Sequence, residues 1–181
     1  DIGESRLQEA KQKIQELGKI ANWHMIGHLQ INKVKKAIQL FDLIHSLDTL
    51  KLATEINRRA ESLNLKVDCL LEVNSSGEQS KYGFDPDETI TAIKKLEDFK
   101  YINIRGLMTI GPHTDNMDSI RKAFTLMRGL FKEGQKIVGD KFSILSMGMS
   151  SDYELAIEEG STMVRIGTAI FGNRPALGTG G

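Results

Sequence analysis

The fold of this chain is decided by two segments near its C-terminal end, Leu145-Ser-Met-Gly-Met-Ser-Ser151 and Ser161-Thr-Met-Val-Arg-Ile-Gly-Thr-Ala-Ile-Phe-Gly172. Each is an apolar run with small and hydroxyl residues at or near its C-terminal end, which predicts two strands that end beside a polar site. Between them, Ser151 with Glu154 three residues later is typical of a capping box at the start of a helix. Free backbone N–H groups at such a turn attract anions. The two segments therefore predict a phosphate-bearing ligand between the last two strands.

The rest of the chain alternates apolar strand-like runs with amphipathic helical stretches. This alternation predicts a parallel sheet with crossover helices, and we expect strands over residues 2–3, 23–28, 43–46, 67–73, 104–110, 142–147 and 163–170. Asp48 is the expected cap of a helix that extends to Leu63, and Asp85 with Pro86 marks the start of another.

Two α/β architectures fit this pattern, an open doubly wound sheet and a (β/α)8 TIM barrel. No G-x-G-x-x-G pattern follows an early strand, which weakens the dinucleotide-binding version of the open sheet. The predicted phosphate site follows the last two strands, where barrels commonly place one, so the barrel is favoured. With seven strands counted, we expect the barrel's first strand to be absent ahead of Asp1. Either further residues precede Asp1 in the molecule, or the barrel is open or completed by a partner. We expect one domain over 1–172, followed by a glycine-rich tail over 173–181.

Composition limits the classes of function. The 181 residues include 24 Lys and Arg against 24 Asp and Glu, so the formal net charge is zero, which argues against a nucleic-acid partner. The apolar runs are too short to span a membrane, and no signal peptide is visible. Cys69 is the single cysteine and can form no internal disulfide, which indicates a reducing, cytoplasmic setting. No Cys/His cluster has zinc spacing, so no metal site is expected.

Several residues are candidates for a binding site on their own chemistry. Arg165 lies within an apolar strand, so it either pairs with an acidic neighbour or donates to a bound ligand. Gly167 and Thr168 suit a phosphate together with Ser150, although a packing glycine and a strand threonine are equally compatible with the pattern. His28 follows Gly27 at a strand end, where barrel sites are found, or is a surface histidine. His24, His45 and His113 are assigned structural roles by default.

The long polar turn after Val73 is a further candidate region. It contains Glu78 and Lys81, which are either solvated loop charges or part of a ligand loop, because long loops in compact domains are often functional.

The chain resembles the pyridoxal phosphate homeostasis proteins, an alanine racemase-like family also called proline synthase co-transcribed. Four segments carry the resemblance, which extends from Gly3 to Gly172: Trp23-His-Met-Ile-Gly-His-Leu-Gln-Ile-Asn-Lys-Val-Lys35, Gly106-Leu-Met-Thr-Ile-Gly111, Leu145-Ser-Met-Gly-Met-Ser150 and Met163-Val-Arg-Ile-Gly-Thr-Ala-Ile-Phe-Gly172. The resemblance implies a fold-type III barrel like the N-terminal domain of alanine racemase, with pyridoxal 5′-phosphate (PLP) as its cofactor.

The resemblance also implies roles for individual residues. Ser150, Gly167 and Thr168 are expected to hold the cofactor phosphate, and Arg165 is expected to face the pyridine nitrogen. An arginine cannot accept a proton, so it keeps this nitrogen unprotonated and weakens the ring as an electron sink. The expected cofactor-binding set is completed by Ser5, His28, Ser146 and Met149.

Two departures from the family pattern concern the cofactor. The family's first strand ends in a lysine that bonds to the cofactor covalently, and we expect this lysine to be absent because the sequence begins after that strand. The family's Gly-Glu-Asn-Arg pattern reads Gly3-Glu-Ser-Arg6, so a contact from Ser5 is shorter than one from asparagine.

The expected function is a cytoplasmic PLP-binding protein of vitamin B6 homeostasis, a cofactor carrier without substantial catalysis. Its partners would be the cofactor and PLP-requiring apoenzymes, and we expect a monomer or weak dimer. The alternative is a fold-type III amino-acid racemase, which needs a second base on the opposite face of the cofactor. A barrel enzyme that binds phosphate without pyridoxal is a third possibility, but no paired carboxylates stand at strand ends to support it.

Overall fold

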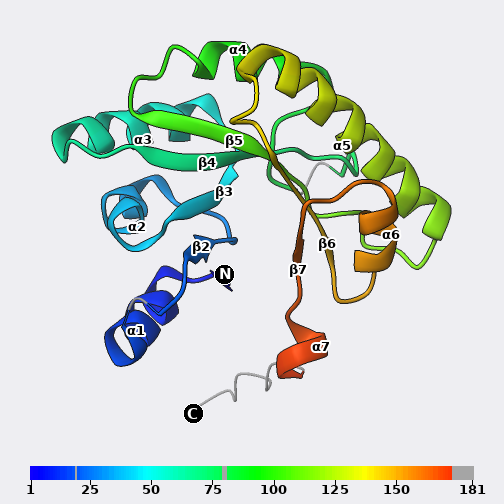
Figure 1. Ribbon diagram of the computed structural model, residues 1–181, viewed down its shortest axis with the longest axis horizontal. Coiled ribbons are helices and arrows are strands. Elements are labelled where there is room, and N and C mark those ends of the chain that lie inside the picture. The colour runs from blue at the N-terminus through cyan, green and yellow to red at the C-terminus, as the bar shows by residue number, and fades with distance from the viewer. Residues whose placement is uncertain (19, 79–80, 173–181) are drawn as a thin grey trace.

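The computed structural model describes residues 1–18, 20–78 and 81–172, and Figure 1 shows them as one curved sheet with helices along its outer side. The sheet has seven parallel strands in the order β1-β2-β3-β4-β5-β6-β7, so every strand pairs with the next one in the sequence. The strands are β1 (Ile2–Glu4), β2 (Trp23–Met25), β3 (Leu43–Leu47), β4 (Val67–Glu72), β5 (Ile102–Met108), β6 (Ile144–Met149) and β7 (Met163–Arg165).

One helical segment follows each strand, as a βα repeat requires. The helices are α1 (Leu7–Leu17), α2 (Val34–Leu40, preceded by the 3-10 turn η1, Ile31–Lys33), α3 (Leu50–Ser62), α4 (Pro86–Leu96), α5 (Met117–Val138), α6 (Tyr153–Glu158) and α7 (Thr168–Phe171). Helices α1 to α6 lie outside the arc of strands, and α7 extends beyond the end of β7 (Figure 1). In the described part of the chain, β1 and β7 each have one neighbouring strand.

The strands are apolar on both faces, and each face serves a different layer. The larger layer lies between sheet and helices and contains Trp23, Ile44, Leu71 and Phe124, each fully buried. A small second cluster lies inside the curve of the sheet, formed by Leu43, Leu70, Met108 and Ile144. The inner face therefore carries its own apolar cluster beside the polar residues of the same strands.

The barrel-type α/β architecture and the seven-strand count are confirmed. The strands expected over 23–28, 104–110 and 142–147 have shifted bounds, Trp23–Met25, Ile102–Met108 and Ile144–Met149. Three other local predictions are wrong. The strand expected over 163–170 ends at Arg165, and Gly167 becomes the residue before α7. Ser151 does not cap α6, because Asp152 occupies that position and makes no side-chain capping bond.

The third error concerns the cap of α3. Thr49 and not Asp48 fills this position, with Oγ1 accepting the N–H of Leu52 at 3.2 Å. By contrast, Asp85 caps α4 as expected, with Pro86 as the first helical residue. The predicted tail, 173–181, lies outside the described residues.

No helix in the described ranges is long and apolar enough to cross a membrane.

Candidate functional site

The C-terminal ends of the seven strands meet at one edge of the sheet, because all of them are parallel. This edge, which we call the mouth, is where the loops after the strands gather. Arg165, Ser150 and Glu72 all lie at or next to the last residue of their strands and therefore belong to it.

Arg165 is held inside the mouth by β7 and its neighbours. Its Nη1 donates to the carbonyl oxygen of Ser146 at 3.0 Å and to Ser146 Oγ at 2.7 Å, and its Nη2 donates to the carbonyl oxygen of Thr109 at 2.7 Å. A guanidinium has five N–H donors, so these bonds leave two that no described residue accepts. Burial lowers the pKa of Arg165 to about 10, while the Glu72 and Asp152 carboxylates raise it. The side chain stays charged at neutral pH and has donors to offer a ligand.

Ser150 lies directly after β6 and faces the start of α7. Its Oγ accepts the N–H groups of Gly167 at 3.3 Å and of Ala169 at 3.2 Å. A Cβ added at Gly167 would meet open space, so this side of the turn is accessible. Thr168 is the first residue of α7 and is exposed. One hydroxyl and two backbone N–H groups thus converge on a single accessible point.

Gly148 explains how β6 delivers Ser150 to this point. Its φ of +95° is rarely adopted by other residues, and an added Cβ would lie 2.5 Å from the Cβ of Ala156. Met149 follows with its N–H donated to Asp152 Oδ1 at 2.6 Å, which fixes the end of the strand on the start of α6. The Met-Gly-Met segment is therefore a backbone device that turns the chain toward the mouth.

A buried polar chain leads from Arg165 across the inside of the sheet. Ser146 Oγ lies 3.1 Å from His45 Nδ1, and His45 Nε2 lies 3.2 Å from His24 Nδ1. His45 is 1 % exposed and Ser146 is fully buried. Burial lowers the pKa of His24 and takes the pKa of His45 to about 3, helped by the nearby His24 and Arg165. Both imidazoles are neutral at physiological pH.

Glu72 adds a carboxyl group to the inner face at the end of β4. It is 6 % exposed, and burial together with the Asp48 carboxylate raises its pKa to about 7, which Arg165 partly opposes. Glu72 also lines a small pocket of about 140 Å³ with Asn74, Lys81, Tyr82 and Ile110. A group that titrates near neutral pH therefore faces the mouth.

The long turn after β4 is tied to the loop after β5. Lys81 Nζ donates to Glu78 Oε1 at 2.7 Å and to the carbonyl oxygen of Gly111 at 3.0 Å. Ser75 Oγ lies 2.8 Å from Thr109 Oγ1, which donates to the carbonyl oxygen of Val73. Glu78 and Lys81 thus bridge two loops at the mouth.

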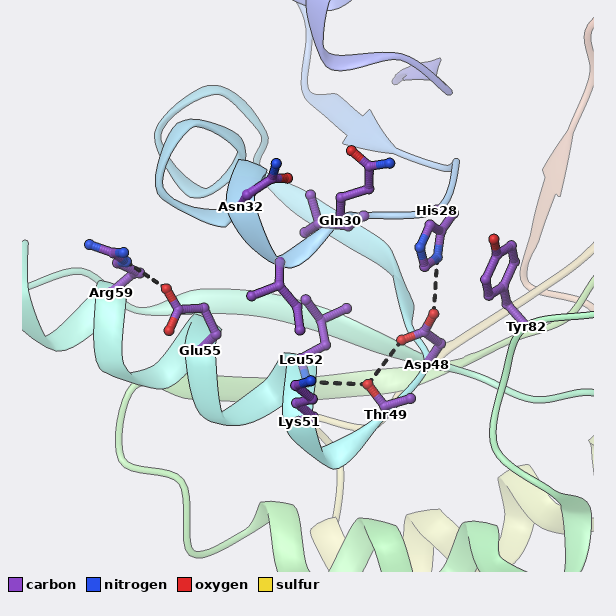
Figure 2. A pocket seen from close by; sticks show the side chains of 12 residues that line it. His28, Gln30, Asn32, Asp48, Thr49, Lys51, Leu52, Glu55, Arg59 and Tyr82 are labelled. Carbon is purple, nitrogen blue, oxygen red and sulfur yellow. Dashed lines mark hydrogen bonds and ion pairs between the residues drawn. The ribbon is translucent and has the colours of Figure 1, made fainter.

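His28 lies three residues beyond β2 and faces a different space. Its Nδ1 is 3.0 Å from Asp48 Oδ2, and its ring stacks on Tyr82 with 3.8 Å between centroids. Figure 2 shows both contacts at one end of a cleft of about 750 Å³ between the segment after β2 and helix α3. This cleft is the larger of the two cavities, but its Glu55 is already paired with Arg59. The two Arg165 donors that no described residue accepts therefore mark the mouth as the better candidate site.

Ser5 follows β1 and is exposed. Its backbone passes so close to Gly27 that a Cβ there would lie 2.3 Å from the Ser5 carbonyl oxygen. The glycine thus allows the loops after β1 and β2 to touch at the mouth.

The structure joins some of the expected site residues and not others. Ser146 contacts Arg165, and Ser150 contacts Gly167, whereas His28 and Ser5 make no hydrogen bond to these four in the described structure. The sequence reasoning missed His24, His45, Glu72 and Thr109 as members of the site. A polar residue two positions after an inward apolar one, as His45 follows Leu43, was the available signal.

No group of three or more His, Cys, Asp or Glu residues in the described ranges is arranged to hold a metal ion.

The fold and the mouth define a class: a parallel, barrel-type βα protein with an arginine, hydroxyl groups and a helix start gathered at its strand ends. The sequence model described as "Alanine racemase, N-terminal domain" matches residues 1–175. A curated relative in Aquifex aeolicus, "Pyridoxal phosphate homeostasis protein", is 43% identical over 173 residues, which are 95% of this chain and 76% of the relative. The chain therefore belongs to the pyridoxal phosphate homeostasis protein family.

Solved structures agree with this assignment. PipY of Synechococcus elongatus PCC7942 with PLP bound is 36% identical with a TM-score of 0.83, over 94% of this chain and 80% of that one. Alanine racemase from Clostridium difficile 630 is 20% identical with a TM-score of 0.78, over 96% of this chain and 44% of that one, and shares the fold.

Proposed function

We propose that this chain binds pyridoxal 5′-phosphate at the mouth and serves as a cofactor carrier in vitamin B6 homeostasis. The observation that carries the proposal is the half-buried Arg165, whose guanidinium is fixed by three hydrogen bonds and keeps two donors for a ligand. The PLP-bound PipY structure supports the identity of the ligand.

The phosphate would lie against Ser150, Gly167 and Thr168. The Ser150 hydroxyl and the N–H groups of Gly167 and Ala169 already converge, so an anion there would replace internal hydrogen bonds with charge-assisted ones. Thr168 adds a second hydroxyl at the accessible start of α7.

The pyridine ring would lie farther inside, with its nitrogen toward Arg165. Because the pKa of Arg165 is about 10, the guanidinium donates to the nitrogen and does not give up a proton at neutral pH. The ring nitrogen then stays unprotonated, and the ring withdraws electrons less strongly. This arrangement favours storage of the cofactor over reaction with amino acids.

The remaining expected site residues have supporting positions in this proposal. Ser146 acts through Arg165, Met149 fixes the end of β6, and Ser5 and His28 border the mouth on the β1–β2 side. Glu78 and Lys81 connect the loops after β4 and β5 beside the proposed ligand site.

The seven described strands contain no lysine, so the contacts proposed for this chain are those to the phosphate and the ring nitrogen. Bound PLP supplies a reactive aldehyde, which we propose is passed on with the cofactor to PLP-requiring apoenzymes. We expect the protein to be a monomer or weak dimer, and a measurement of its molar mass by light scattering checks this.

Binding is tested by isothermal titration of the purified chain with three ligands. We expect saturable binding of PLP and of pyridoxine 5′-phosphate, which has no aldehyde, and at least tenfold weaker binding of pyridoxal, which has no phosphate. Ser150→Ala should weaken both phosphorylated ligands and leave pyridoxal unchanged, while Ser62→Ala, on the exposed end of α3, is the matched control. Absence of saturable PLP binding at millimolar concentration would overturn the proposal.

The carrier proposal also predicts little chemistry on amino acids. The three tyrosines offer no second base inside the mouth: Tyr82 stacks on His28 at the rim, Tyr101 lies beside Lys100 before β5, and Tyr153 begins α6. Alanine incubated with the PLP-loaded chain in deuterated water should keep its α-hydrogen. Exchange at a rate typical of enzymes, about 1 per second or faster, would favour a racemase instead.

A further inference from the structure

The buried polar chain His24–His45–Ser146–Arg165 joins four strands across the inside of the sheet. His45 on β3 and Ser146 on β6 are 101 residues apart in the sequence, and their side chains meet at 3.1 Å. His24 comes from β2 and Arg165 from β7, with contacts of 3.2 Å to His45 and 2.7 Å to Ser146. Phosphate or ring binding at the mouth does not by itself explain the two histidines, because they lie behind Arg165.

The positions of the hydrogen atoms in this chain can be derived. Arg165 is only a donor, so it uses a lone pair of Ser146 Oγ. Each neutral imidazole has one N–H and one acceptor nitrogen, so only one hydrogen lies between His45 and His24. Two arrangements remain: the hydrogens point either from Ser146 toward His24 or from His24 toward Ser146.

Two observations select the first arrangement. If His45 donated to Ser146, the Ser146 hydroxyl hydrogen would need another acceptor, and the described residues offer this fully buried group none. At the other end, His24 Nε2 lies 3.8 Å from Asp1 Oδ1, and a carboxylate favours an N–H on the nitrogen that faces it. Ser146 therefore donates to His45 Nδ1, and His45 Nε2 donates to His24 Nδ1.

We propose that His45 is a positioning residue that acts on Arg165 through Ser146. His24 holds His45 as the Nε2–H tautomer. His45 Nδ1 then accepts a hydrogen bond from the Ser146 hydroxyl, and the lone pairs of Ser146 Oγ remain available to accept from Arg165. The guanidinium is thereby fixed in the orientation that keeps its two remaining donors for the ligand. The part of this proposal that concerns the ligand rests on the proposed function, whereas the hydrogen-bond direction does not.

The first test uses the ligand-free chain without substitution. Long-range ¹H–¹⁵N spectra of uniformly ¹⁵N-labelled protein report the tautomer and charge of each histidine. We expect His24 and His45 as neutral Nε2–H tautomers at pH 7 to 8, with His45 still neutral at pH 6, and the exposed His113 serves as the reference signal. An Nδ1–H tautomer of His45, or a charged His45 at pH 7, would overturn the proposal.

The second test removes the acceptor that His45 provides. In His45→Leu we expect the Arg165 Nη1–H groups to exchange with solvent at least tenfold faster, because Ser146 no longer orients the guanidinium. His45→Asn restores an oxygen near the position of Nδ1 and should keep exchange within threefold of the original chain, as should the surface control His113→Asn. Unchanged exchange in folded His45→Leu would contradict the proposal, and if that variant does not fold, Ser146→Ala must show the same acceleration.

The third test joins the inference to the ligand. The affinity for PLP should fall at least fivefold in His45→Leu and recover in His45→Asn, with the affinity for inorganic phosphate unchanged in both. Equal PLP affinity in all folded variants would overturn the link to the ligand. If the original chain binds no PLP, the proposed function fails, while the tautomer and exchange results still decide whether the positioning chain exists.

Discussion

Two titratable groups inside the sheet, Glu72 and His45, have pKa values displaced in opposite directions. The pKa of Glu72 is raised from 4.5 to about 7, and that of His45 is lowered from 6.5 to about 3. Each displacement makes the free energy of unfolding depend on pH by about 1.4 kcal/mol per pH unit per proton. Between pH 4.5 and 6.5 the two dependences oppose one another, so the stability of the chain should be nearly flat there.

Substitution of Glu72 should reveal how much this residue contributes to the pH dependence of the free energy of unfolding. The folded pKa is raised, so its stabilising effect is complete below pH 4.5 and is lost as the pH rises to 7. We therefore expect the free energy of unfolding of Glu72→Gln, relative to that of the original chain, to rise by roughly 2 to 3 kcal/mol between pH 4.5 and pH 8. Urea unfolding at both pH values measures this difference. Glu133→Gln, on the exposed side of α5, should show none, and an equal result for both variants would contradict the assignment.

His45 should make the folded state less stable at acidic pH. Its folded pKa is lowered, so its contribution is complete above pH 6.5 and is lost progressively as the pH falls toward 3. In Glu72→Gln, where the opposing dependence is removed, the free energy of unfolding should fall by about 1.4 kcal/mol per pH unit below pH 6.5. The further substitution His45→Asn should reduce this slope by the contribution of one proton, about 1.4 kcal/mol per pH unit. An unchanged slope would show that other groups cause the acid sensitivity.

At the scale of single elements, the sequence predicted the order of strands and helices but misplaced several boundaries. The alternation of apolar runs and helical faces is repeated over tens of residues, so the predicted order of elements does not depend on any single residue. A cap depends on the backbone of one residue, and Asp48 and Thr49 are chemically equivalent candidates until the backbone selects one. The end of β7 was missed for a similar reason, because the apolar pattern of Val164 to Ile170 is compatible with both a strand and a short helix.

The cap of α3 gives a direct test at this scale. Thr49→Ala removes the acceptor of the Leu52 N–H and should destabilise the chain by about 1 kcal/mol. Thr49→Ser keeps the hydroxyl and should remain within about 0.5 kcal/mol of the original. Thermal unfolding of the two variants measures the contrast, and equal stabilities would mean that the hydroxyl does not cap the helix.

At the scale of the whole molecule, the sequence allowed Ser150 and Arg165 to be placed at neighbouring strand ends, and their roles toward phosphate and ring stay predictions, whereas the connections behind them could not be predicted. Ser150 and Arg165 lie in compact motifs at strand ends, where spacing is informative. His45 was assigned a structural role because its partner is 101 residues away, and no local pattern shows such a contact. Glu72 was missed because its altered pKa comes from burial and from Asp48, which directly follows β3.

The arc of strands predicts a gradient of backbone stability. β4 and β5 have neighbours on both sides and pair over six residues of register, whereas β1 and β7 have one neighbour each in the described chain. Amide hydrogen exchange should be slowest in β4 and β5 and at least a hundredfold faster in β1 and β7, in line with local opening of edge elements. Exchange measured by NMR or mass spectrometry checks this, and equal protection of all seven strands would contradict it.

The strictly sequential order of the strands has a consequence for how the chain folds. Each strand from β2 to β7 pairs with the one made just before it, so the sheet can grow strand by strand as the polypeptide leaves the ribosome, with one helical crossover to close at each step. The His45–Ser146 bond is the exception, since it must wait until β6 has been synthesised. Early intermediates would therefore hold the His24–His45 pair on an open inner face without its Ser146 partner, and the arrival of β6 would be the event that buries it.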